Sequence, residues 1–396
     1  MQAPNDLSYF AHTNHRRPFR TFGIKQADRL SHMYVIGKTG TGKTTLLETL
    51  LTQDIHHGRG CALLDPHGDL VERLVAALPV HRQSDLIYFN VPDPKLPYGY
   101  NPFAPVSAEL RPLVASGLIE ILKKMWDDSW GVRMEHILRN TIFALLDQPS
   151  ARLPDILRML TDKNFRYQAV KNIQNEQVRT FWHDEFPKYS LRYQADGIAP
   201  IQNKVGAFLT DPKLQHIFTR SDGQLRLRSI MDDGKILLVN LAKGRIGEDS
   251  AALLGGLLVT SLGLAAFSRA NIPEEERRPF YIYLDEFQNF TTLSLANMLS
   301  ELRKYGAAVV TAHQYLHQLD LDIREAVLGN TGTLISFRLG ARDAPFIARE
   351  FAPAFDAVDL IRLPNHHIYL RLLVDGAPLL PFSATTITPR NAVNIQ

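Results

Sequence analysis

The sequence predicts an α/β fold in which helices flank a largely parallel β-sheet and an all-α domain is inserted. The first observation behind this is that short continuous apolar runs recur along the chain, each followed by a longer helical stretch. Continuous runs indicate strands buried on both faces, as in a parallel sheet between two helix layers. The second is a break in this rhythm between about residues 107 and 215, where the pattern is helical.

Seven apolar runs are expected to form the strands of this sheet. In chain order they are residues 32–36, 61–64, 86–89, 236–241, 280–284, 307–310 and 333–337. Near the C-terminus, HHIYLRLLVDG followed by APLLPF is typical of two strands joined by a turn at Asp375 and Gly376. We expect this hairpin to extend one edge of the sheet.

The break divides the chain into four parts. Residues 1–31 form an N-terminal segment, 32–106 the first part of the α/β domain, 107–215 the all-α insert, and 216–396 the second part with the C-terminal hairpin. A chain of 396 residues suits one large domain that carries an inserted one. Because the α/β pattern resumes at Ile236, the two halves of the sheet must meet in space.

The composition, with 45% hydrophobic and 21% charged residues, is typical of a soluble globular protein. A net charge of +3 is too small to indicate nucleic-acid binding by itself. The single cysteine, Cys61, excludes an intramolecular disulfide and a zinc site of paired cysteines, and we expect it to be buried. The N-terminus lacks the apolar core of a signal peptide.

The uncharged stretch 250–268 is long enough to cross a bilayer. Its glycines, serines and threonine, and its place between two strand-like runs, favour a buried helix instead. We therefore expect a cytoplasmic protein without a direct membrane span.

Residues 37–44, GKTGTGKT, match the pattern GxxxxGK[ST] in full and lie between an apolar run and an amphipathic stretch. Glycines let backbone N–H groups surround an anion, and a helix N-terminus adds partial positive charge. The motif predicts an ATP site, with Lys43 at the β- and γ-phosphates and Thr44 at Mg²⁺; a glycine-rich turn without ligand is the disfavoured alternative. The predicted cofactor-binding residues are Gly37, Lys38, Thr39, Gly40, Thr41, Gly42, Lys43, Thr44 and Thr45.

The run FYIYL places Asp285 and Glu286 at the carboxyl end of a strand, where open α/β sheets bind ligands. The aspartate can complete the Mg²⁺ shell, and the glutamate can orient and deprotonate a water. Two acids after a strand are usually a solvated turn, but the phosphate loop upstream favours catalysis here.

Two further strand ends carry polar side chains. The run AAVVTA ends in His313 and Gln314, and this glutamine can sense the γ-phosphate, with a simple polar strand end as the alternative. In LLDPHGDL, Asp65, His67 and Asp69 also follow a strand, and a role in the cleft and helix capping by Asp69 remain equally open.

Charge that develops on a transferred phosphoryl group is often met by an arginine from a neighbouring subunit. By position alone, the candidates are Arg303, Arg338, Arg342 and Arg349.

With these motifs in order, the chain resembles the FtsK and HerA superfamily of DNA-pumping ATPases, most closely the conjugative coupling proteins of type IV secretion systems. The resemblance covers about residues 28–382. It rests on DRLSHMYVIGKTGTGKTTLL, LLDPHGDL, YIYLDEFQNF, LSELRKYG followed by VVTAHQYL, and GNTGTLISFRLGARDA.

The resemblance implies a RecA-like ATPase with Lys43 at ATP, Thr44 and Asp285 at Mg²⁺, and Glu286 as the base. Gln314 matches the sensing glutamine of the family. Arg303, eleven residues before it, takes the place of the arginine finger and ranks above the other arginines.

The family works as hexameric rings with DNA in the channel, and the helical insert looks like the all-α domain of coupling proteins. Typical coupling proteins begin with membrane-spanning helices, whereas this chain begins almost at the motor. The resemblance thus leaves two possibilities. In one, a membrane-anchoring or relaxosome-type partner holds the protein at the inner face of the membrane. In the other, the protein is a soluble relative of coupling proteins that acts on DNA elsewhere.

Independent support for DNA is limited. Residues 163–192 interleave basic side chains with aromatic ones, which suits single strands. An aromatic core under a solvated basic face explains the same residues and is favoured, and the cluster His15, Arg16, Arg17 and Arg20 is equally ambiguous. Two alternative functions remain: a secretion or assembly ATPase that acts on protein, and a nucleotide-gated scaffold, against which an intact Glu286 argues.

Overall fold

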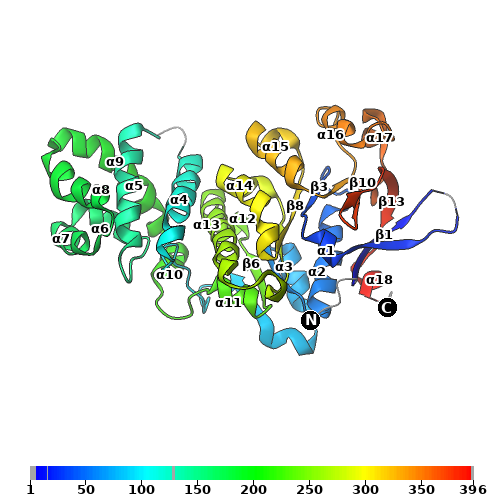
Figure 1. The fold of residues 1–396 in the computed structure, drawn as a ribbon, viewed down its shortest axis with the longest axis horizontal. Coiled ribbons are helices and arrows are strands. Elements are labelled where there is room, and N and C mark those ends of the chain that lie inside the picture. Colours follow the sequence, from blue (N-terminus) through cyan, green and yellow to red (C-terminus); the bar gives the residue numbers. More distant parts are fainter. Residues whose placement is uncertain (1–5, 16, 127–129, 394–396) are drawn as a thin grey trace. The chain divides into compact units, whose positions relative to one another are not determined.

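The computed structural model of the protein describes residues 6–15, 17–126 and 130–393, which form two compact units (Figure 1). The first unit comprises Met1–Asn90, Arg228–Ala242 and Ala265–Gln396, and the second comprises Val91–Leu227 and Lys243–Leu264. The second unit contains the whole of residues 107–215, extends beyond them at both ends, and takes in a further segment after the sixth strand of the chain.

The first unit contains an 11-stranded sheet in the order β2-β1-β13-β10-β9-β3-β8-β7-β4-β6-β5. Its seven-stranded half is parallel throughout and consists of the seven strands that the apolar runs predict. These are β3 (Met33–Ile36), β4 (Gly60–Asp65), β5 (Leu86–Asn90), β6 (Ile236–Asn240), β7 (Phe280–Leu284), β8 (Ala307–His313) and β9 (Thr333–Ser336). The predicted α/β fold class is therefore confirmed.

The other half of the sheet is antiparallel. It consists of β1 (Leu7–Thr13), β2 (Thr21–Lys25), β10 (His367–Arg371) and β13 (Phe382–Thr386). The C-terminal hairpin was expected at an edge, and this is wrong, because β1 pairs with β13 and places β1 and β2 outside it. The turn at Asp375 and Gly376 instead joins the short strands β11 (Leu373–Val374) and β12 (Ala377–Pro378), a separate sheet.

The helices of the first unit surround the sheet. They are α1 (Gln26–Arg29), α2 (Lys43–His56), α3 (Asp69–Ala76), α14 (Leu293–Leu302), α15 (Leu321–Asn330), α16 (Ala344–Phe351), α17 (Ala357–Arg362) and α18 (Pro389–Val393). The side chains of α2 pack with those of β3, β4 and β7 in one apolar core, which includes Leu47, Leu50 and Cys61. Cys61 is buried, as predicted.

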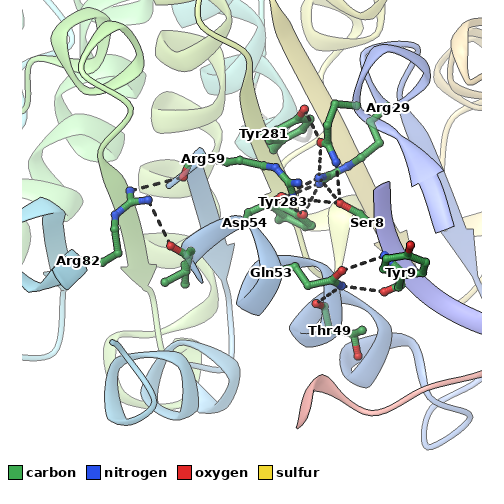
Figure 2. A network of polar contacts seen from close by, with 12 residues as sticks. Ser8, Tyr9, Arg29, Thr49, Gln53, Asp54, Arg59, Arg82, Tyr281 and Tyr283 are labelled. Carbon is green, nitrogen blue, oxygen red and sulfur yellow. Dashed lines mark hydrogen bonds and ion pairs between the residues drawn. The ribbon is translucent and has the colours of Figure 1, made fainter. Parts of the chain in front are cut away.

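A buried polar network ties α2 to α1 and β7 (Figure 2). Arg29 donates two hydrogen bonds to the Asp54 carboxylate, at 2.6 and 2.8 Å, and Arg59 donates a third at 3.2 Å. The Tyr283 hydroxyl donates to the same carboxylate at 2.5 Å. Burial alone would raise the pKa of Asp54, but the two arginines outweigh it and hold that pKa below its ordinary value. The phosphate-loop helix is thus anchored at its C-terminal half.

The second unit is helical. Its helices are α4 (Arg111–Met125), α5 (Val132–Leu146), α6 (Asp155–Thr161), α7 (Lys163–Asn172), α8 (Glu176–Thr180), α9 (Leu191–Thr210), α10 (Pro212–Thr219) and α12 (Lys243–Ile246), while α11 (Leu227–Asp232) and α13 (Glu248–Phe267) contain residues of both units. In the part of the chain that the structure describes, one helical stretch, Glu248–Asn271, is long and apolar enough to span a membrane. It consists of α13 and the 3₁₀ turn after it, and 72% of its most apolar part is buried.

The aromatic residues of the insert form a core. Phe181, Trp182 and Phe186 are buried, and the rings of Phe181 and Trp182 pack edge to face with centroids 5.0 Å apart. The favoured interpretation of these three residues is confirmed. Tyr167 differs, since 66% of it is exposed. Of the N-terminal basic cluster, Arg16 lies outside the described residues.

Candidate nucleotide site

The phosphate loop lies between β3 and α2, as its motif predicts. Gly42 has a φ of 122° and Gly40 a φ of 74°, which other residues rarely adopt. A Cβ at Gly37 would lie 2.5 Å from the Cβ of Phe337. The glycines of the motif are therefore required by the backbone and by close packing against the end of β9.

The Lys43 side chain folds over its own loop. Its ammonium donates to the carbonyl oxygens of Gly37, at 2.6 Å, and Lys38, at 3.1 Å. Burial lowers the pKa of Lys43, while Glu286 and Asp285 act in the opposite direction. The ammonium is thus held between the loop and the acidic pair, where a bound phosphate could replace the two carbonyl groups as its partner.

The remaining loop residues frame this ammonium. Thr39 and Gly40 are exposed at the tip, while the Thr41 hydroxyl donates to the Lys38 carbonyl at 2.7 Å. Thr44 and Thr45 are half-buried in the first turn of α2, whose N-cap, Gly42, provides no side-chain hydrogen bond. The amide groups at this helix start are therefore suited to an anion.

A chain of hydrogen bonds joins three of the predicted site residues. Gln314, just after β8, donates its amide to Glu286 Oε1 at 2.6 Å, and its own oxygen accepts from the Thr39 hydroxyl at 2.8 Å. Gln288 donates to the other oxygen, Glu286 Oε2, at 2.7 Å. Glu286 itself has a left-handed backbone, with φ 47°. The carboxylate is therefore held in one orientation beside the loop.

Asp285 lies in a cluster of carboxylates. Burial raises its pKa to about 6, and the negative charges of Asp65 and Glu286 add to this, while Lys43 opposes it. Among the described residues, no group of three or more His, Cys, Asp or Glu side chains could hold a metal. A cation that relieves this repulsion would therefore need oxygens from Thr44 and from bound phosphates as well, which is how Mg²⁺ is usually held at such loops.

Asp65 caps α3. Its carboxylate accepts from the backbone N–H groups of His67 (2.8 Å), Leu70 (2.9 Å) and Val71 (3.2 Å). The sequence left capping by Asp69 open, but the capping side chain is Asp65, because the α3 N-cap is Gly68 and makes no side-chain bond. Asp65 thus both caps the helix and adds charge next to Asp285.

His313 is buried beneath the site. Burial, followed by the charge of Lys43, lowers its pKa to about 3. Its Nε2 lies 3.3 Å from the Tyr34 hydroxyl. The lowered pKa favours the neutral imidazole, whose ring also packs against Tyr34, with centroids 5.3 Å apart.

Arg303 lies at the opposite end of the sheet. It precedes β8, whose first residue, Ala307, pairs with Phe280, the first residue of β7, whereas the loop follows the last residue of β3. His32 lies just before β3, and its burial and then the nearby positive charge of Arg303 lower its pKa to about 4. The structure does not bring Arg303 to the loop of its own chain.

Of the other arginines, Arg338 flanks the loop. Its guanidinium donates to the Leu363 carbonyl at 3.1 Å and to Asn365 Oδ1 at 2.8 Å, while its carbonyl accepts from the Lys38 N–H at 2.9 Å. Arg342 and Arg349 are exposed. Arg338 therefore has structural partners within the chain.

Sequence reasoning missed Gln288, which fixes the second oxygen of Glu286. No pattern marks it, because a glutamine two residues after an acidic pair has no distinctive spacing. It also left open which way Gln314 faces, and this depends on β7 and β8 being neighbours.

The chain matches a known protein family and several solved structures. The profile of the family described as "Type IV secretion-system coupling protein DNA-binding domain" matches residues 21–333. No curated protein sequence matches the chain. Among solved structures, the chain is similar to the plasmid coupling protein TrwB in complex with ADP and Mg²⁺, with 17% identity and a TM-score of 0.66, over 98% of this chain and 96% of that one.

Two further structures are similar. TrwB in complex with the ATP analogue ADPNP has 19% identity and a TM-score of 0.61, over 91% of this chain and 86% of that one. VirB4 of Thermoanaerobacter pseudethanolicus has 12% identity and a TM-score of 0.62, over 98% and 97%. These likenesses confirm the RecA-like fold. Since the family profile covers more than half of the residues, the chain belongs to the type IV secretion-system coupling protein DNA-binding domain family.

Proposed function

We propose that the chain is an ATP-hydrolysing motor that moves DNA. The observation that carries the proposal is the chain of hydrogen bonds from Thr39 through Gln314 to Glu286, beside the buried ammonium of Lys43. It joins a phosphate-loop side chain to a carboxylate at a neighbouring strand end. Through such a link, the presence or loss of the γ-phosphate can change the position of the catalytic base and of the strands that carry these residues.

Each residue has a role in this proposal. Lys43 exchanges its two loop carbonyls for β- and γ-phosphate oxygens, and Thr44 and Asp285 hold Mg²⁺, which neutralises charge on those oxygens. Glu286 takes a proton from the attacking water; its two recorded side-chain hydrogen bonds leave acceptor capacity for that water.

DNA is proposed as the cargo because the family is described as a DNA-binding domain. TrwB is described as a plasmid coupling protein in complex with ADP and Mg²⁺ and with non-hydrolysable nucleotide analogues. A hexameric ring around the DNA, and a partner that holds the motor at a membrane, remain part of the proposal.

The test is ATP turnover without DNA, with single-stranded DNA and with duplex DNA. We expect DNA to raise turnover in the wild type, Lys43→Ala to abolish it, and Glu286→Gln to lower kcat by about 100-fold or more, since the amide cannot accept the proton. Glu72→Gln, at an exposed glutamate of α3, is the matched control and should keep wild-type turnover.

Two outcomes would contradict parts of the proposal. Undiminished turnover in Glu286→Gln would remove that residue as the base. Turnover that is indifferent to both forms of DNA would argue against DNA as the cargo and favour an ATPase that acts on protein.

A further inference from the structure

His366 flanks the phosphate loop but has no part in the site described so far. It precedes β10 and has a left-handed backbone, with φ 64°. Its N–H donates to the Thr41 carbonyl at 2.8 Å, and its own carbonyl accepts from the Thr386 N–H at 2.9 Å. The Thr386 hydroxyl donates to the same carbonyl at 3.2 Å. A conformation that costs most residues about 1 to 2 kcal/mol is thus maintained by backbone bonds to the loop and to β13.

The His366 imidazole lies against the loop. A Cβ built at Gly42 would be 2.9 Å from its Nδ1. The residue is nevertheless exposed, and within the described part of the chain no hydrogen bond, ion pair or ring contact of the imidazole is recorded. A polar ring is therefore positioned next to the loop with its edge available.

The strand order separates two sides of the loop. In the sheet, β8 and β7 lie on one side of β3, and β9 and β10 lie on the other. Glu286 and Gln314 come from the first side, so the γ-phosphate of a bound nucleotide must face it. The nucleoside, at the other end of the triphosphate, is then left with the side from which His366 comes.

The segment on the β9 and β10 side of the loop is held in place by hydrogen bonds. Arg338 fixes the segment before His366 through the Leu363 carbonyl and the Asn365 side chain, and it also binds the Lys38 N–H. The backbone that carries the imidazole is therefore held next to the loop without a ligand. A flat ring with two nitrogen atoms can stack on a base and can bond a ribose hydroxyl.

We propose that His366 contacts the nucleoside of the bound nucleotide and determines the preference for a nucleoside triphosphate over inorganic triphosphate. This inference rests on the proposed ATP site and extends it. His366 is not one of the residues proposed to hydrolyse ATP, so its substitution should change the affinity for the nucleotide and not the rate of the chemical step.

The test measures the Kd of MgATP and of magnesium tripolyphosphate for the wild type, His366→Asn and His366→Gly. Both substitutions tolerate the left-handed backbone, so the fold should be retained. We expect the Kd of MgATP to rise about fivefold to a hundredfold, by the usual worth of stacking a base on an aromatic ring. The Kd of tripolyphosphate should stay within about twofold of the wild type, since it has no base to stack.

His81→Asn, at an exposed histidine before β5, is the control and should bind both ligands normally. Equal weakening of both ligands in the His366 variants, or no weakening of MgATP, would overturn this inference and leave the ATP site intact. A wild-type protein that binds neither ligand would overturn the proposed function, and this inference with it.

Discussion

At the scale of single residues, the site is characterised by carboxylates that are almost fully buried. Asp285 is only 6% exposed and lies near two other acids. Its negative form is therefore unfavourable until a cation arrives. The same burial that prepares the site for Mg²⁺ should make the metal-free protein less stable.

This cost gives a pH dependence with a definite sign. The pKa of Asp285, about 6, is above its ordinary value of 3.8, so between these values the folded chain binds more protons than the unfolded one. Stability should fall as the pH rises through this window, and the cost is fully present above pH 6. Asp285→Asn should remove a penalty of about 3 kcal/mol at pH 7 and almost none at pH 4.

Urea unfolding without Mg²⁺, at pH 7 and pH 4, measures this difference. Asp69→Asn, at an exposed acid in the first turn of α3, is the control and should show no such pH-dependent gain. The assignment fails if Asp285→Asn changes stability equally at both pH values.

At the scale of elements, α2 is bound to the sheet at both of its ends. Its start carries the phosphate loop, and its end carries Asp54, which faces the buried arginines Arg29 and Arg59 (Figure 2). Gln53 in the same turn donates to the Tyr9 carbonyl and accepts from the Tyr9 N–H, and so holds β1. The loop is therefore part of a rigid connection between the N-terminal strands and β7.

Asp54→Ala tests this anchor. The variant leaves two buried guanidinium groups without their carboxylate, and we expect it to lose about 3 to 5 kcal/mol of unfolding free energy. The comparison is the partly exposed pair between Glu48 of the same helix and Arg73 of α3, and Glu48→Ala should cost about 1 kcal/mol or less. Denaturant unfolding measures the loss of unfolding free energy in both variants. Similar losses would show that the buried network does not anchor the helix.

At the scale of the whole molecule, the position of Arg303 decides what one chain can do alone. It lies at the amino ends of the strands, and its own loop lies at the carboxyl ends. If it stabilises the transferred phosphoryl group, it must do so in the site of another copy. We expect Arg303→Ala to lower kcat by about 10³-fold or more.

Mixing experiments separate this role from a local defect. Arg303→Ala protein supplies intact loops and Lys43→Ala protein supplies intact arginines, so their mixture should regain part of the turnover. Lys304→Ala, at the exposed neighbour in the same turn, should behave as the wild type. A mixture that stays inactive at every ratio would exclude Arg303 as a residue shared between copies.

Local patterns determined much of this protein. Continuous apolar runs predicted the parallel strands, because burial on both faces favours apolar side chains at most positions of a strand. The loop motif predicted its strand-to-helix turn, because glycine suits the positive φ angles of that backbone. By contrast, β1 and β2 escaped prediction. They are half-buried, and a register shift between Tyr9 and Ala11 breaks their alternation.

The tertiary structure decided which strand ends meet. The bond between Gln314 and Glu286 exists because β8 and β7 are neighbours, and Arg303 is remote because a helix returns the chain to the other end of the sheet. His366, just before β10, reaches the loop although it lies far from it along the chain. Periodicity and motif spacing predict the local structure of the segment in which a residue lies. Strand order, which brings distant segments together, is set by the packing of the whole chain.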